Sequence, residues 1–318
     1  MKVLVIGGSG FIGTRLCKRL RGIAAVKFVI LDKQESEVFP GSTLICDIED
    51  YDDLERQFPN DIDLVINLAA EHKDNIQPKS RYHDVNVIGQ QNICSVMQKK
   101  GIKRHIFTSS VAVYGFVTKE TFEDGSYQPF HEYGQSKLDA EKVLDKWYES
   151  GAEQHSVIRP TVVFGEGNRG NVYNLLRQIA SGKFLMIGDG ANRKSMAYVE
   201  NVAAFIEFLI LNGDGYQVFN YVDKPDFNMN ELYLEVNKAL GKRPKSIRIP
   251  YFLGLLAGYA FDFLSVFTRK EFPISAIRVK KFCGTTQFGS INIDKAGFKA
   301  PISVASGLAA TVEAEFKK

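Results

Sequence analysis

The sequence contains few cysteines and no cysteine cluster. Four occur among 318 residues, and no two of them form a CxxC pair. This spacing argues against a zinc motif or a disulfide framework, so we expect reduced thiols in a cytoplasmic protein that binds no metal. The four positions are Cys17, Cys46, Cys94 and Cys283.

The sequence also lacks an excess of charge and a long apolar run. The 40 basic and 37 acidic residues leave a net charge of +3, without the basic face that nucleic-acid binding needs, so we expect no nucleic-acid partner. Glycines interrupt the apolar N-terminus after six residues, which is too short for a signal-peptide core. Export is therefore not expected.

A glycine-rich turn follows the first apolar segment. Residues 2–6, "KVLVI", predict a buried parallel strand, and "GGSGFIG" leads into a segment with helical spacing of apolar residues. In a strand–turn–helix unit of this kind, backbone N–H groups at the helix start can face a pyrophosphate. The predicted cofactor contacts in the turn are Gly7, Gly10, Phe11, Ile12 and Gly13.

Further cofactor contacts are predicted where the next strands end. Asp32 ends the segment "KFVIL" and lies 19 residues after Gly13, where a carboxylate can accept hydrogen bonds from the adenine ribose. Because it would repel a 2′-phosphate, NAD is favoured over NADP. Asp47 and Ile48 either cap the adenine or form a simple turn, and Ala69 ends a strand predicted within residues 63–70.

A tyrosine and a lysine four residues apart indicate redox chemistry. Tyr133 and Lys137 share one face of a predicted helix. A tyrosine pKa near ~10 makes a poor base, but an ammonium one turn away favours the phenolate. The segment 105–115 is predicted as a strand carrying three hydroxyl groups, among them Ser109 and Ser110, at the sheet edge where ligands bind.

Together, these motifs resemble the extended short-chain dehydrogenase/reductase family of sugar-nucleotide epimerases and dehydratases. The resemblance implies an α/β fold: a Rossmann-type doubly wound parallel sheet with a smaller, mainly C-terminal substrate domain. It implies that Ser110 and Tyr133 bind the sugar hydroxyl that is oxidised, that Lys137 contacts the nicotinamide ribose, and that Asn86 is structural. The expected cofactor domain is 1–165 with a returning segment near 195–222, and the substrate domain is 166–194 with 223–318.

The serine strand distinguishes between activities within this family. Dehydratases carry an acidic pair in a "TDEVYG" pattern, but here Ser109, Ser110 and Val111 stand at that place. Dehydration is therefore disfavoured, and the resemblance implies NAD-dependent 4-epimerisation through a transient 4-keto sugar.

Longer segments are similar to the 4-epimerases of undecaprenyl-diphosphate-linked N-acetylglucosamine. They include "LAAEHKDN", "GNRGNVYNLLRQIA" and "RVKKFCGTTQF". Lys194 replaces the arginine that pairs with the diphosphate in ordinary nucleotide-sugar epimerases, which puts a uridine pocket in doubt. The resemblance implies a role in O-antigen or other surface polysaccharide synthesis. Candidate substrate contacts, or alternatively plain polar loop residues, are Ser109, Asn168, Arg169, Asn171, Arg193, Lys194 and Arg278.

One apolar segment, residues 251–267, stands apart. It holds six aromatic residues and one charge, Asp262, and is shorter than the ~20 residues of a membrane span. The segment fits either an interfacial helix or a helix in the core or in a homodimer interface. The resemblance favours the first and implies peripheral contact through 251–281 at the inner face of the cell membrane. The nearby cations are Arg269, Lys270, Arg278, Lys280 and Lys281. A soluble UDP-sugar 4-epimerase and a non-catalytic NAD-binding scaffold are the alternative functions.

Overall fold

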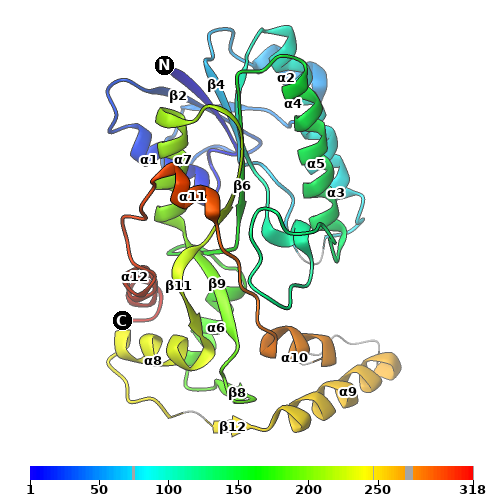
Figure 1. Ribbon diagram of the computed structural model, residues 1–318, viewed down its shortest axis with the longest axis vertical. Helices are drawn as coiled ribbons and strands as arrows, with labels where there is room; N and C mark the ends of the chain where they lie inside the picture. Colours follow the sequence, from blue (N-terminus) through cyan, green and yellow to red (C-terminus); the bar gives the residue numbers. More distant parts are fainter. Residues whose placement is uncertain (74–75, 246, 269–274, 318) are drawn as a thin grey trace.

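A parallel β-sheet forms the larger part of the molecule (Figure 1). The computed structural model describes residues 1–73, 76–245, 247–268 and 275–317. All neighbouring strands of this sheet run parallel. In spatial order the strands are β10 (Gly215–Tyr221), β6 (Gln154–Pro160), β5 (Arg104–Thr108), β4 (Leu64–Asn67), β1 (Lys2–Ile6), β2 (Lys27–Asp32) and β3 (Thr43–Ile45).

Helices cover both faces of the sheet, which confirms the predicted doubly wound α/β fold. Alternate residues of β1 enter two separate cores: Val3 and Val5 face one, and Leu4 and Ile6 the other. The first core is closed by α1 (Phe11–Leu20) and α7 (Val199–Asn212). The second is closed by α2 (Tyr51–Gln57), α4 (Gly89–Lys99) and α5 (Glu132–Glu149). Before α4 the chain forms α3 (Arg81–His83) and the π-helical turn η1 (Asp84–Ile88).

A smaller lobe lies below the carboxyl ends of the strands (Figure 1). Its own core is formed mainly by two small sheets and three helices. One sheet contains β11 (Asp223–Asn228), β9 (Arg193–Tyr198) and β7 (Val162–Phe164), and the other β12 (Ile247–Ile249) and β8 (Leu185–Ile187). The helices are α6 (Asn171–Ala180), α8 (Met229–Ala239) and α12 (Val304–Phe316). The chain returns from this lobe to the large sheet through α7 and β10, and α11 (Ile291–Ala296) packs against β10.

The strand predicted within residues 105–115 is shorter than expected. β5 ends at Thr108, and the short 3₁₀ helix η2 (Val111–Tyr114) follows. The Ser110 hydroxyl accepts a hydrogen bond from the backbone N–H of Ala112, which caps this helix. This cap stabilises the 3₁₀ helix although the valines that follow Ser110 favour a strand.

The apolar segment forms α9 (Tyr251–Thr268), a helix at the margin of the smaller lobe beside α10 (Ala276–Cys283) (Figure 1). Eight of its large side chains are between 42% and 70% exposed. They are Tyr251, Phe252, Leu253, Leu256, Tyr259, Phe263, Leu264 and Phe267. The alternative of a helix buried in this chain's own core is therefore wrong. Among the described residues, no helix has the length and hydropathy needed to cross a bilayer.

Candidate active site

The glycine turn brings β1, α1 and the end of β4 into close contact. Gly7 has a φ of +78°, and a Cβ placed there would lie 2.6 Å from the backbone nitrogen of Ala69. A Cβ on Gly13 would overlap the carbonyl oxygen of Gly7. These two glycines therefore allow the turn to close against the neighbouring strand.

The middle glycine of the motif, Gly10, leaves room for a ligand. Gly10 is exposed at the N-terminus of α1, where no side chain caps the helix and the first turn has no acidic residue. Unpaired backbone N–H groups in this position suit a pyrophosphate. The side chains of Phe11 and Ile12 pack into the cores, so any contact they make with a cofactor involves their backbone.

Asp32 lies at the carboxyl end of β2, beside this turn. Its carboxylate accepts hydrogen bonds from the backbone N–H groups of Ser9 and Gln34, both at 3.1 Å. In the loop after β3, Asp47 accepts from the N–H of Glu49 at 3.1 Å, and Ile48 is buried against Gly89. Asp47 and Ile48 thus form a turn, and this turn does not exclude the predicted contact of the pair with the adenine.

The residues of the predicted catalytic set converge at the ends of β5 and α5. Tyr133 lies in the first turn of α5, and its phenol hydrogen-bonds to the Ser110 side chain. One turn further on, the buried Lys137 donates a hydrogen bond from Nζ to the carbonyl oxygen of Thr108 at 2.8 Å. The same Nζ lies 4.8 Å from the ring centroid of Phe107. A base candidate, a hydroxyl donor and a buried amine thus share one edge of the sheet.

Burial shifts both titratable groups toward their neutral forms. It raises the pKa of Tyr133 to about 12, partly offset by the hydrogen bond with Ser110. It lowers the pKa of Lys137 to about 7, partly offset by the negative charge of Glu141. The pKa shift of Tyr133 thus favours the neutral phenol, and Lys137 is not among the groups that shift it.

Two residues missed by the sequence reasoning support this arrangement. Glu141 is buried one turn beyond Lys137 on the same face of α5 and pairs with the buried Arg159 of β6 through two hydrogen bonds of 3.0 and 2.6 Å. Arg159 also donates to the hydroxyls of Tyr114 and Tyr127, at 2.6 and 2.7 Å. The spacing of 133, 137 and 141 along the helix is the signal that could have identified Glu141.

Several predicted substrate contacts have partners within the protein. Asn168 donates to the Val163 carbonyl and accepts from the N–H of Gly170, which shapes the turn before α6. Arg169 pairs with Glu315 at 2.7 Å and lies over the ring of Tyr173. Asn171 is exposed at the start of α6. These contacts favour the polar-loop alternative for Asn168 and Arg169.

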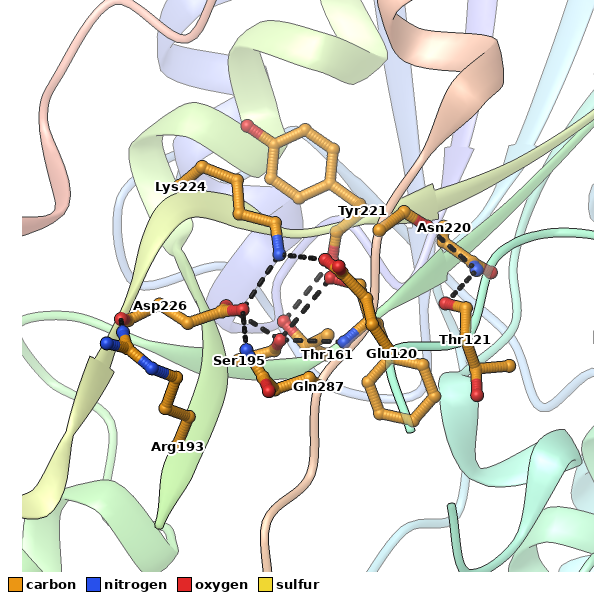
Figure 2. A network of polar contacts seen from close by, with 12 residues as sticks. Glu120, Thr121, Thr161, Arg193, Ser195, Asn220, Tyr221, Lys224, Asp226 and Gln287 are labelled. Carbon is orange, nitrogen blue, oxygen red and sulfur yellow. Dashed lines mark hydrogen bonds and ion pairs between the residues drawn. The ribbon is translucent and has the colours of Figure 1, made fainter. Parts of the chain in front are cut away.

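Arg193 borders a polar network in the small sheet. Its guanidinium donates to the backbone carbonyl of Asp226 at 2.7 Å. Figure 2 shows Lys224, Ser195 and Gln287 converging on the buried carboxylate of Asp226. This network fixes the segment around Gln287 to β9 and β11.

Lys194 holds the end of α10. Its Nζ donates to the carbonyls of Lys281 and Gly284 at 2.9 and 2.5 Å and to the hydroxyl of Thr286 at 3.1 Å. Burial lowers its pKa to about 8. Arg278 is exposed on α10, while the Ser109 hydroxyl is buried without a hydrogen-bond partner among the described residues. The predicted cations Arg269 and Lys270 lie outside the described residues.

The sequence pattern of the NAD dependent epimerase/dehydratase family matches residues 3–221. The chain belongs to this family. It is 50% identical over 317 residues to an N-acetyl-alpha-D-glucosaminyl-diphospho-ditrans,octacis-undecaprenol 4-epimerase of Escherichia coli O157:H7, a match covering 99% of this chain and 95% of the relative. It is 27% identical to a UDP-glucose 4-epimerase of Vibrio cholerae, over 98% of this chain and 94% of that one.

The fold has a solved counterpart in the UDP-glucose 4-epimerase of Thermotoga maritima. The TM-score is 0.78 at 22% identity, and the match covers 99% of this chain and 98% of the other. Membership of the family makes this protein an NAD-dependent enzyme. The open helix N-terminus at Gly10 and the carboxylate of Asp32 fit a dinucleotide at this edge of the sheet.

Proposed function

We propose that this protein is an NAD-dependent 4-epimerase that interconverts N-acetylglucosamine and N-acetylgalactosamine linked through diphosphate to undecaprenol. The observation that carries the substrate assignment is the 50% identity, over nearly the full length of both chains, to an enzyme named for this substrate. The substrate is a membrane lipid, so the proposal places the enzyme at the inner face of the cell membrane, in surface polysaccharide assembly such as O-antigen synthesis.

The site geometry supports the following catalytic roles. Tyr133 acts as the base for the C4 hydroxyl of the sugar, and Ser110 orients that hydroxyl. The chemistry that NAD would supply at this site is reversible hydride transfer at C4 of the sugar, and the positive charge of the oxidised cofactor would favour the phenolate of Tyr133. The backbone around Gly7, Gly10 and Gly13 holds the pyrophosphate, and Lys137 adds positive charge beside the ribose.

The expected catalytic loss tests these roles. Tyr133→Phe should keep NAD binding and the far-UV circular dichroism spectrum, yet lower turnover roughly 10²–10⁴-fold because the base is gone. Product would be measured by sugar analysis after incubation with undecaprenyl-diphosphate-linked N-acetylglucosamine, and in parallel with UDP-N-acetylglucosamine. Conversion of the nucleotide sugar alone would contradict the proposed substrate, and near-normal turnover of the variant would contradict the mechanism.

The exposed face of α9 supports peripheral membrane binding. Gly254 and Gly258 lie on the buried side of this helix, and five of its six aromatic residues are exposed. Lys280 lies 5.6 Å above the ring of Tyr259, which adds a cation beside the apolar surface. Each CH₂ group buried in the membrane contributes about 0.8 kcal/mol to the free energy of binding, and each cation near an anionic surface contributes about 1 kcal/mol.

Liposome flotation tests the membrane contact. The wild-type protein should float with anionic vesicles and be partly released by high salt, because charge and apolar surface act together. Replacing Phe252, Phe263 and Phe267 with Ser should leave it at the bottom of the gradient. The matched control is Leu211→Ser with Leu234→Ser, two side chains that are each 52% exposed on other helices. Equal flotation of both sets, or none by the wild type, would contradict this assignment.

A further inference from the structure

Two exposed phenylalanines form a pair outside the cores. Phe116 and Phe130 are 54% and 52% exposed, and their ring centroids lie 4.2 Å apart. They stand near the two ends of the loop that joins η2 to α5. Gly115, with a φ of +70°, allows the loop ends to approach because a Cβ there would overlap the carbonyl oxygen of Gln128. Paired exposed aromatic rings of this kind suit an apolar ligand.

A cation from the smaller lobe lies over this aromatic pair. Lys281 of α10 has its Nζ 5.1 Å from the ring centroid of Phe130 and 5.9 Å from that of Phe116. Among the described residues, Lys281 forms no ion pair with a carboxylate. The cluster therefore offers positive charge and apolar surface at one place.

This cluster adjoins the reacting end of the site. The ring of Phe130 lies 6.2 Å from that of His131, which in turn lies 5.9 Å from the ring of Tyr133. His131 is fixed at this point because its Nδ1 accepts a hydrogen bond from the N–H of Gly134 and caps α5. The aromatic pair is thus two ring contacts away from the phenol.

The other side of the cluster leads to α9. Lys281 belongs to α10, and α10 packs closely on α9, since a Cβ on Gly258 would lie 2.7 Å from the backbone nitrogen of Ala276. In Figure 1 the loop before α5 reaches down toward α10, and α9 lies below α10 at the margin of the molecule. Moving outward from Tyr133, the order is therefore His131, the Phe116–Phe130 pair with Lys281, and then the exposed face of α9.

We propose that Phe116, Phe130 and Lys281 form a subsite for the diphosphate and the first isoprene units of the lipid-linked sugar. The inference rests on the proposed function. With C4 of the sugar at Tyr133, the diphosphate on C1 leaves from the opposite side of the ring and is followed by the polyprenyl chain. Lys281 matches the anion, the two phenylalanine rings match the isoprene units, and α9 receives the chain where it enters the bilayer.

The test compares two soluble substrates in the same detergent, which removes the contribution of membrane binding. One is N-acetylglucosamine diphosphate esterified with a short prenyl chain, and the other carries a methyl group in its place. The wild type should prefer the prenyl ester. In the double variant Phe116→Ser with Phe130→Ser, the ratio of the two kcat/KM values should fall about tenfold, within the range that lost apolar contacts give in a binding site.

Additional variants separate the contributions. Leucine at both positions should restore the preference, because apolar surface is what the chain requires. Lys281→Met should lower kcat/KM for both esters alike, since both contain the diphosphate. Leu234→Ser on α8 is the control for loss of an exposed apolar side chain elsewhere.

The outcomes distinguish this inference from the proposed function. If the wild type epimerises neither ester nor the undecaprenyl substrate, the proposed function is wrong and the subsite with it. If the wild type prefers the prenyl ester but the serine variant keeps that preference, only the subsite is wrong. A wild type that turns over both esters equally also overturns the subsite.

Discussion

Two apolar helices of this protein, α7 and α9, occupy opposite environments. α7 has nine buried residues and packs between α1 and the large sheet. α9 is longer, at 18 residues, yet most of its large side chains face outward. An apolar composition alone does not distinguish a core helix from an exposed one, so the difference must come from what each helix packs against.

The contact face of α9 explains its position. Its buried residues include Gly254 and Gly258, four residues apart, and a Cβ on Gly254 would lie 2.6 Å from Cγ2 of Ile187. The carboxylate of Asp262, the single charge in the segment, accepts a hydrogen bond from the N–H of Ala276 at 3.0 Å. Small residues and one acid thus attach the helix, and eight of its large side chains are exposed to bind another surface.

The largest predicted effect concerns the buried helix. Phe205 of α7 is fully buried, with its ring near Phe219, Tyr221 and Phe298. Phe205→Ala should lower the free energy of unfolding by about 3–5 kcal/mol, because the packed core cannot close the cavity. Urea denaturation followed by circular dichroism measures it. A loss below 1 kcal/mol would mean that α7 is not the core element described above.

The interior of the large sheet should also be sensitive to acid. His105 and His155 are fully buried on neighbouring strands, with ring centroids 5.8 Å apart and no hydrogen-bond partners for their ring nitrogens among the described residues. Burial lowers the pKa of His155 to about 3, so the unfolded chain binds the proton first as the pH falls. The stabilising effect of the neutral ring is complete above pH ~6.5 and declines below it.

Replacing one histidine should therefore flatten the acid response. Between pH 7 and pH 5, the free energy of unfolding of His155→Phe should fall by about 2 kcal/mol less than that of the wild type. This difference follows because one proton bound on unfolding changes the free energy of unfolding by about 1.4 kcal/mol per pH unit. Denaturation midpoints at both pH values supply the comparison. Parallel losses in the two proteins would show that His155 does not titrate on unfolding.

The glycine face of α9 should tolerate little added volume. Gly258→Leu should push α10 away and lower the free energy of unfolding by about 1–2 kcal/mol, as overpacking does. The neighbouring Ala257 is exposed, and Ala257→Leu is the control that should leave stability unchanged. Equal stability of the two variants, measured by thermal denaturation, would argue against a close α9–α10 contact.

The smallest effect on stability is expected on the outer face of α9. Phe263 is 65% exposed, so Phe263→Ala should change the free energy of unfolding by less than about 0.5 kcal/mol. The same substitution weakens vesicle binding under the membrane proposal. A destabilisation comparable to that of Phe205→Ala would mean that this face is covered by protein, as in a homodimer.

Local spacing was enough to predict the strand–glycine turn–helix unit and the placement of Tyr133 and Lys137 one turn apart in α5. Both depend on residues within one strand–turn–helix unit or one helix turn, where periodicity fixes the relative positions. The pairing of Glu141 with Arg159 could not be predicted, because it depends on where α5 lies across β6. The same holds for Asp262, which looked like an interruption of an apolar segment until its partner in α10 was known.

The position of β10 has a consequence for synthesis of the protein on the ribosome. β6 pairs along all seven of its residues with β10, and residues 161–214 must emerge between the two strands. Throughout that interval β6, whose residues are all buried in the folded protein, presents an open hydrogen-bonding edge to other nascent chains. The rate of translation of residues 161–214 therefore determines how long the large sheet, still without β10, can associate with other nascent chains on the same polysome.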